Sequence, residues 1–110
     1  MQYSAPILSF LLLISVSINA QKSYQKNYFD NGILKSEGWI KNSQKSDYWK
    51  FYYQNGTLQK EGRFVNNKET KYWYFYREDG TKIREGHYIN GVKSKWWLFY
   101  DDMDLSLIHI

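Results

Sequence analysis

The chain contains no cysteine, and its only proline is Pro6. Disulfide bonds and cysteine-ligated zinc or iron–sulfur centres are therefore excluded. Residues 21–110 also lack alanine, the strongest helix former, which argues against a helical domain. At 110 residues the chain is too short for a large enzyme fold such as a β/α barrel. Its net charge of +4 is spread along the chain and indicates an anionic partner only weakly.

Aromatic side chains are abundant, with 5 Trp, 11 Tyr and 6 Phe. Branched aliphatic residues are scarce, because residues 21–104 contain only nine Leu, Ile and Val. The core of any folded domain must therefore be built from rings, and a single twisted sheet is favoured over a two-layer sandwich.

The first twenty residues predict an export signal. Residues 7–18 are apolar apart from three serines, and this run is too short to span a bilayer. Asn19 and Ala20 follow it, so we expect a signal peptide over 1–20, cleaved after Ala20. An uncleaved anchor is the alternative, whereas a lipoprotein anchor is excluded because no cysteine follows the run. The mature chain is then periplasmic, displayed at the cell surface or secreted.

A period of 24 residues organises the chain after Tyr24. It defines three units, 28–51, 52–75 and 76–99, within a repeat domain over 21–101. The columns that we expect to be structural contain Gly32, Gly38, Trp49, Phe51, Gly56, Gly62, Trp73, Phe75, Gly80, Gly86, Trp97 and Phe99.

Each unit predicts a β-hairpin, because Asn-Gly or Asp-Gly between aromatic segments is a strong hairpin signal. A two-residue loop at Asn55-Gly56 would place Lys50 opposite Glu61 as an ion pair. It would also place Trp49 opposite Gly62, and we expect the indole to cover that glycine. By the same count, Trp73 would cover Gly86.

Strands and turns alternate as in an antiparallel meander. The predicted fold is all-β, an elongated array of hairpins in one twisted sheet. Strands are expected near 25–30, 33–41, 48–54, 57–65, 72–78, 81–89 and 95–101, with a second set of turns at 41–43, 65–68 and 89–91.

The two faces of the predicted sheet differ in composition. Trp and Phe of the repeat columns share one face, which is the expected packing face. The second face carries the candidate partner contacts, since Tyr and Trp are enriched at binding hot spots. These candidates are Tyr48, Lys50, Tyr52, Tyr72, Tyr74, Tyr76 and Trp96. Packing of these side chains within the array or against a neighbouring chain is the alternative.

The string NG-x-x-x-x-EG-x-x-x-N…W-x-F-Y resembles the MORN-repeat variant of bacterial proteins, many of which are known as YwqK-type antitoxins. The match runs from Tyr24 to Asp101. The resemblance implies an elongated hairpin array with a binding or scaffolding role and no chemistry of its own. The family often has glycine two residues before the repeated Trp, where this chain has Asp47, Lys71 and Lys95. A cytoplasmic antitoxin role also does not suit an exported chain.

The segment Gly38-Trp39…Trp49-Lys50-Phe51-Tyr52 is similar to choline-binding cell-wall modules. Only the first unit has Gly-Trp, because the others have Gly62-Arg63 and Gly86-His87.

The last residues follow no repeat column. Tyr100-Asp101 begins a fourth unit, and 102–110 then depart from the pattern. Counting on by 24 places the glycine that would face Trp97 at Ile110. We interpret 102–110 as an atypical tail, either from a truncated or artefactual reading frame or as a natural short end.

The sequence predicts no enzyme, since no nucleophile, phosphate loop or metal motif is present. Neither a cofactor nor a metal site is expected, and the repeated glutamates are interpreted as structural. Export and the modest charge argue against nucleic acid.

The predicted function is non-catalytic binding of an unidentified protein partner, or scaffolding, at the bacterial envelope. The alternatives are peripheral binding to anionic lipid and binding to cell-wall glycan or choline. Lipid binding would use the turn lysines Lys68, Lys71, Lys93 and Lys95. Open edge strands make self-association a further expectation.

Overall fold

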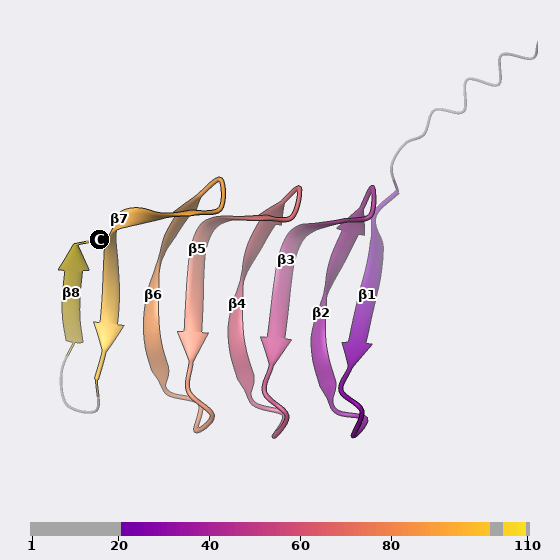
Figure 1. The fold of residues 1–110 in the computed structure, drawn as a ribbon, viewed down its shortest axis with the longest axis horizontal. Coiled ribbons are helices and arrows are strands. Elements are labelled where there is room, and N and C mark those ends of the chain that lie inside the picture. The colour runs from indigo at the N-terminus through magenta and orange to yellow at the C-terminus, as the bar shows by residue number, and fades with distance from the viewer. Residues whose placement is uncertain (1–20, 102–104, 110) are drawn as a thin grey trace, which may run out of the picture.

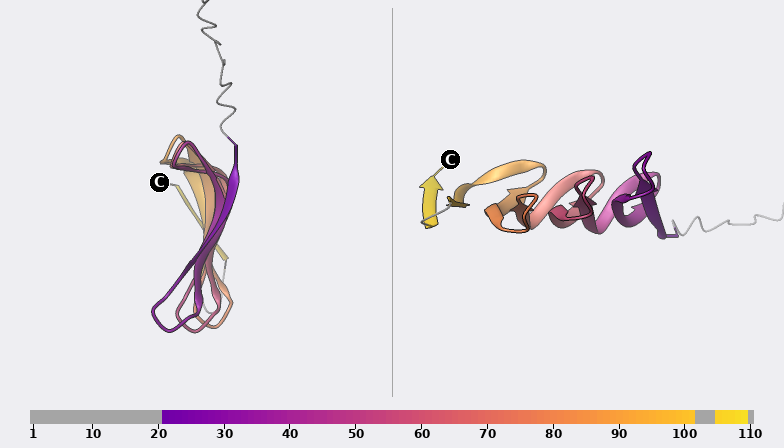
Figure 2. Two further views of the ribbon diagram at one scale, coloured as in Figure 1. Left: turned by 90° about the vertical axis from the view of Figure 1, so that its right-hand side faces the viewer. Right: turned by 90° about the horizontal axis from the view of Figure 1, so that it is seen from below.

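The computed structural model describes residues 21–101 and the strand 105–109. They form one antiparallel sheet whose eight strands lie side by side in chain order (Figure 1). The strands are β1 Ser23–Tyr28, β2 Leu34–Lys41, β3 Gln44–Tyr52, β4 Leu58–Val65, β5 Lys68–Tyr76, β6 Lys82–Ile89, β7 Val92–Tyr100 and β8 Leu105–His109. The sheet is one layer thick, twisted and open, with β1 and β8 at its edges (Figure 2). The prediction of an all-β, single antiparallel sheet is confirmed. The predicted signal peptide lies outside the described residues.

The lower edge in Figure 1 holds three loops, each three residues long rather than the predicted two. In the middle loop the Gly56 N–H donates to the Tyr53 carbonyl at 2.9 Å, and the Tyr53 N–H donates to the Thr57 carbonyl at 2.8 Å. Only Gly56 takes a positive φ, of 90°. This is a type I turn closed by a left-handed glycine. The Asn55 side chain accepts from the Thr57 N–H at 3.0 Å and holds the turn.

A compensating bulge preserves the predicted register beyond that loop. Tyr52 pairs with Leu58 and Phe51 with Lys60, so Gln59 is an extra residue on β4. The longer loop would shift every later pair by one residue, and the bulge reverses that shift. Trp49 therefore still lies opposite Gly62.

The upper edge consists of two-residue turns. Lys41 pairs with Gln44 and Ile89 with Val92, which leaves only Asn42-Ser43 and Asn90-Gly91 between the strands. All four turn residues have positive φ, between 51° and 81°. These are type I′ turns, which match the right-handed twist of the flanking strands. β3, β5 and β7 therefore begin earlier than the sequence predicted.

Each of these three strands contains a bulge just before its repeated tryptophan. On β3, Gly38 pairs with Trp49 but Trp39 pairs with Ser46, so Asp47 and Tyr48 are extra. Asp47 and its counterpart Lys71 both have φ of 60°, a conformation that favours glycine. The bulge bends the strand, and the ribbon turns a corner there (Figure 1).

The core consists of tryptophans stacked on glycines. Trp49 and Trp73 are 1% exposed and Trp97 is fully buried. A Cβ atom added at Gly62 would lie 2.2 Å from Cδ2 of Trp73. Each indole thus covers the glycine of the strand before it, and the prediction that Trp49 covers Gly62 is wrong. The pairing across the strands is as predicted, but each ring lies over the preceding strand, where Trp49 Nε1 donates to the Trp39 carbonyl at 2.8 Å.

Further rings complete this core, as the scarcity of aliphatic residues predicted. Phe64 and Tyr88 are buried between the indoles, with ring centroids 5.0 Å from Trp73 and 5.1 Å from Trp97 respectively. The partly buried members are Ile40, Phe51, Phe75 and Phe99.

The strand that pairs with β7 is β8, in which Ile108 lies opposite Trp97. Gly86 already accommodates the Trp97 indole, so no glycine is required in the following strand. The expected requirement for one at the Ile110 position is therefore wrong. Residues 102–104 and 110 lie outside the described part of the chain.

Candidate functional site

Paired tyrosines hold each repeated glutamate on one face of the sheet. Tyr48 and Tyr76 both donate to the Glu61 carboxylate, Tyr76 at 2.7 Å. Tyr24 and Tyr52 hold Glu37 in the same way, while Tyr100 donates to Glu85, whose charge also acts on the pKa of Tyr72. We call these three arrangements tyrosine clamps and the surface that carries them the tyrosine face.

The clamps shift the titration of their members. The Tyr24 hydroxyl donates to Glu37, which raises the pKa of Tyr24 to about 12 and lowers the pKa of the Glu37 carboxyl. Burial, and then the Glu85 charge, raise the pKa of Tyr72 to about 12. Both effects keep the phenols neutral beside charged carboxylates.

Four of the seven predicted partner contacts, Tyr48, Tyr52, Tyr72 and Tyr76, are members of clamps. The other three candidates also lie on β3, β5 and β7. The ring centroids of Tyr74 and Tyr72 lie 5.1 Å apart, and the Lys82 ammonium lies 5.0 Å from the Tyr74 centroid. Lys50 and Trp96 are exposed, Trp96 by 55%. The tyrosine face thus brings the candidates together, with most of their hydroxyls engaged within the sheet.

Lys50 pairs in register with Glu61, as predicted. The Glu61 carboxylate, however, is held by two tyrosine hydroxyls. Ion pairs among the described residues include Lys22–Asp47 and Lys82–Glu85. The predicted ion pair between Lys50 and Glu61 is thus replaced by a clamp.

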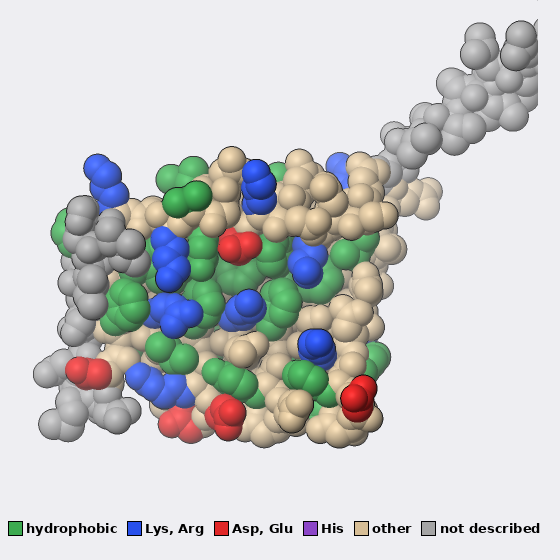
Figure 3. Space-filling model, in the orientation of Figure 1, with side chains coloured by type: hydrophobic (Ala, Val, Ile, Leu, Met, Phe, Trp, Pro, Cys, Tyr) green, Lys and Arg blue, Asp and Glu red, His purple; other side chains and the backbone are tan. Residues whose placement is uncertain are grey.

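The opposite face, the ring face, carries cations above its aromatic core. The Lys60 ammonium lies 4.7 Å from the Phe51 centroid, and the Arg84 guanidinium lies 4.2 Å from that of Phe75. Lys45 is 5.5 Å from the Trp49 ring. Figure 3 shows Lys and Arg side chains standing singly among hydrophobic ones. Each such contact contributes about 0.5–1 kcal/mol at an exposed site.

The cations of the ring face also influence one another. Burial lowers the pKa of Lys60, and the nearby charges of Lys45 and Arg84 lower it further, against the opposing effect of Glu69. Arg84 Nε is buried and has no hydrogen-bond partner within the described residues. The ring face therefore presents a positive, partly desolvated surface.

These cations were not predicted, although the sequence contains the signal for them. The predicted register already placed Phe51 opposite Lys60, and the structure confirms that pair. Arg84 lies 24 residues after Lys60 and occupies the same column. A basic residue in register with a ring column indicates a cation–ring contact.

Hydrogen bonds join neighbouring hairpins at both edges, with one gap. At the upper edge, the Lys45 N–H donates to Asn67 Oδ1 at 2.6 Å. At the lower edge, the Tyr53 hydroxyl donates to the Tyr76 carbonyl at 2.6 Å, and Arg77 donates to the Tyr100 carbonyl at 2.6 Å. Phe29 occupies the equivalent place in the first hairpin and has no hydroxyl to donate.

His87 is exposed, and its ring lies edge-on to that of Tyr72 with the two centroids 4.8 Å apart. No group of three or more His, Asp or Glu suited to a metal ion occurs over 21–101 and 105–109. The described residues include no helix long and apolar enough to cross a membrane.

Comparison with protein-family models and with curated proteins found no match to this chain.

Proposed function

We propose that this chain is an exported, non-catalytic repeat module that binds or scaffolds a protein at the bacterial envelope. The period of 24 residues, the similarity to MORN-repeat variants and the apolar leader support the repeat and export parts of the proposal. The observation that carries the binding part is the ring face. No second layer of the described chain covers it, and its cations stand over half-buried rings.

The ring face fits an acidic protein surface better than the tyrosine face does. Carboxylates of a partner could bind Arg84 and Lys60 while its apolar side chains contact the rings. On the tyrosine face the clamps already engage most polar groups. The candidate contacts on that face therefore remain secondary contacts, and Trp96 is the most exposed ring among them.

The test captures partners from an envelope extract with three baits. These are the wild-type chain, the double variant Lys60→Gln/Arg84→Gln and the tyrosine-face variant Lys50→Gln. We expect one protein that binds the wild type saturably at micromolar concentration, binds Lys50→Gln equally and is lost from the double variant. Recovery of no protein would reject the proposal, and equal capture by the double variant would reject the ring face as its site.

Peripheral binding to anionic lipid is the second candidate, favoured by the exposed lysines of the upper edge. These residues are Lys68, Lys71, Lys93 and Lys95. Phosphatidylglycerol vesicles should sediment the chain at low salt and release it as salt rises. Absent or salt-insensitive sedimentation would eliminate this candidate.

A further inference from the structure

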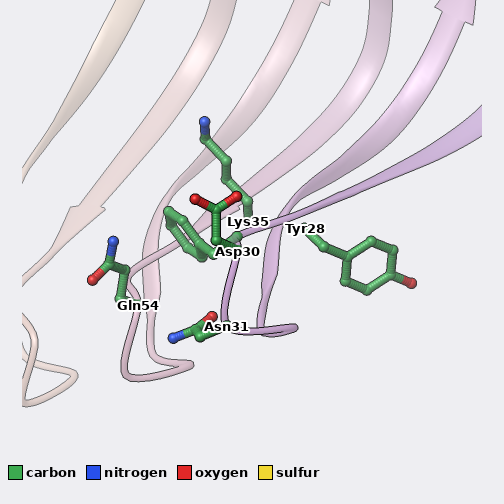
Figure 4. Close-up of a pocket in the computed structure, with 6 residues that line it drawn as sticks. Tyr28, Asp30, Asn31, Lys35 and Gln54 are labelled. Carbon is green, nitrogen blue, oxygen red and sulfur yellow. The ribbon is translucent and has the colours of Figure 1, made fainter.

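The gap between the first two lower loops opens a cleft. Phe29, Phe51 and Lys35 line it, together with the amides of Gln54 and Gln59 and the Glu78 carboxylate. Its volume is about 330 Å³, at the lower end of the range for small-molecule sites. A second hollow at Asp30 and Asn31 adjoins it. Figure 4 shows this second hollow, in which Gln54 and Lys35 rise from neighbouring hairpins.

The first hairpin differs from the next two at one column beside the cleft. Tyr53 and Arg77 each donate to a backbone carbonyl 23 residues further along the chain. Asn55 adds a bond to the Glu78 carbonyl at 3.2 Å. Phe29 leaves the corresponding carbonyl, that of Tyr52, without such a donor. The first loop is therefore not joined to the second in this way.

The polar groups of the cleft have unused hydrogen-bonding capacity. The amides of Gln54 and Gln59 make no hydrogen bond with any described residue. Each amide both donates and accepts, which matches a hydroxyl group that does the same. Phe29 and Phe51 supply the apolar rings of the cleft.

The charges of the cleft select against ionic ligands. The Lys35 ammonium, which lies 5.7 Å from the Phe29 centroid, would repel choline or another quaternary ammonium. The Glu78 carboxylate, with Asp30 nearby, would repel a polyanion. An uncharged ligand with one apolar face and a polar edge fits best.

We propose that this cleft is a binding site for a neutral saccharide, with a pyranose ring against the phenylalanines and its hydroxyls bonded to Gln54 and Gln59. Lys35 and Glu78 bond the outer hydroxyls. Lys60 and Arg84, which decide the protein-binding proposal, do not line the cleft, although the Lys60 ammonium lies 4.7 Å from the centroid of Phe51, which does. The variants below therefore alter Gln54, Gln59 and Phe29 and leave Lys60 and Arg84 in place.

The test is a titration of the ¹⁵N-labelled full chain with cellotriose, chitotriose and maltotriose, followed by amide chemical shifts. At least one trisaccharide should bind with a dissociation constant of about 1 mM or below. The shift changes should centre on Phe29, Lys35 and Gln54. Phosphocholine should produce no such changes.

Three variants locate the site. Gln54→Ala/Gln59→Ala removes two hydrogen bonds and should weaken binding by about tenfold or more. Phe29→Tyr supplies the missing hydroxyl, which should bond to the Tyr52 carbonyl, narrow the cleft and weaken binding while leaving the fold intact. Gln44→Ala, the matched control on the upper edge, should bind normally.

Co-sedimentation with insoluble peptidoglycan distinguishes a wall polymer from a free sugar. Pelleting that the Gln54→Ala/Gln59→Ala variant loses assigns the site to the wall. Trisaccharide binding without pelleting assigns it to a soluble sugar. Absence of both, tighter binding of phosphocholine, or trisaccharide affinity unchanged in Gln54→Ala/Gln59→Ala would overturn the proposal.

Discussion

The two faces of the sheet use aromatic rings in opposite ways. On the ring face, Trp73 is 1% exposed and lies directly on Gly62, so its contribution to stability comes from burial of the indole. On the tyrosine face, Tyr48 and Tyr76 keep their rings half-exposed and donate their hydroxyls to Glu61. One sequence period therefore carries two independent stabilising columns. One depends on close packing and the other on charge-assisted hydrogen bonds.

Substitution at Gly62 should produce the largest effect. Gly62→Val places atoms where the Trp73 indole lies, and we expect a loss of about 3 kcal/mol or more in the free energy of unfolding. The control is Gln59→Val, at the nearby bulge outside the core, with an expected change within about 0.5 kcal/mol. Urea unfolding followed by tryptophan fluorescence measures both. Equal melting temperatures would show that the ring face does not depend on the glycine.

Removal of a clamp should have a smaller effect. Glu61→Ala leaves the Tyr48 and Tyr76 hydroxyls without their acceptor, which should cost about 2 kcal/mol. Lys50→Ala removes the residue opposite and should cost less than about 0.5 kcal/mol. The same unfolding assay applies to both variants. If Lys50→Ala were as damaging as Glu61→Ala, the cross-strand ion pair rather than the clamp would hold this face.

The sequence was sufficient to predict the sheet, its order and the alignment of Trp49 with Gly62. It was not sufficient to identify the glycine that each indole covers, because Trp49 has a glycine opposite it on both neighbouring strands. The hydrogen bond from Trp49 Nε1 to the Trp39 carbonyl holds the ring over Gly38, and the register alone does not reveal that bond. Loop length was mispredicted for a related reason. A glycine with positive φ ends both loop types, and only the bulge at Gln59 distinguishes them.

The candidate sites were predictable to different degrees. The cations of the ring face follow from register, because Lys60 lies directly opposite Phe51. The clamps do not, because Glu61 draws one tyrosine from β3 and the other from β5, 13 and 15 residues away. The cleft depends on a hydroxyl that is absent from Phe29, and this matters only once the bond made by Tyr53 is known.

The corners between the faces provide a matched pair of lysines 24 residues apart. Lys71 has a φ of 60°, whereas Lys95 does not take a positive φ. Lys71→Gly should therefore stabilise the chain by about 1 kcal/mol, and Lys95→Gly should destabilise it by about 0.5–1 kcal/mol. Thermal unfolding of the two variants checks the signs. Destabilisation by Lys71→Gly would mean that the left-handed corner does not position Tyr72 and Trp73 on their two faces.

The dependence of stability on pH should be the smallest effect, because Tyr24 is 47% exposed and solvent screens its clamp. The folded pKa of Tyr24, about 12, exceeds the ordinary value of 10.0. The unfolded chain therefore loses this proton first, so the contribution is complete below pH 10 and disappears as pH rises towards 12. The folded pKa of Glu37 is lowered, so its contribution to stability is present above the ordinary carboxyl range and disappears as the pH falls below that range.

Urea unfolding at successive pH values should show both losses of stability. Tyr24→Phe should reduce the alkaline loss, and Glu37→Gln should reduce both. Tyr28→Phe, at an exposed hydroxyl on the same strand, should leave the profile unchanged. A profile that is identical in Glu37→Gln and the wild type would remove the clamp as a source of stability on the tyrosine face.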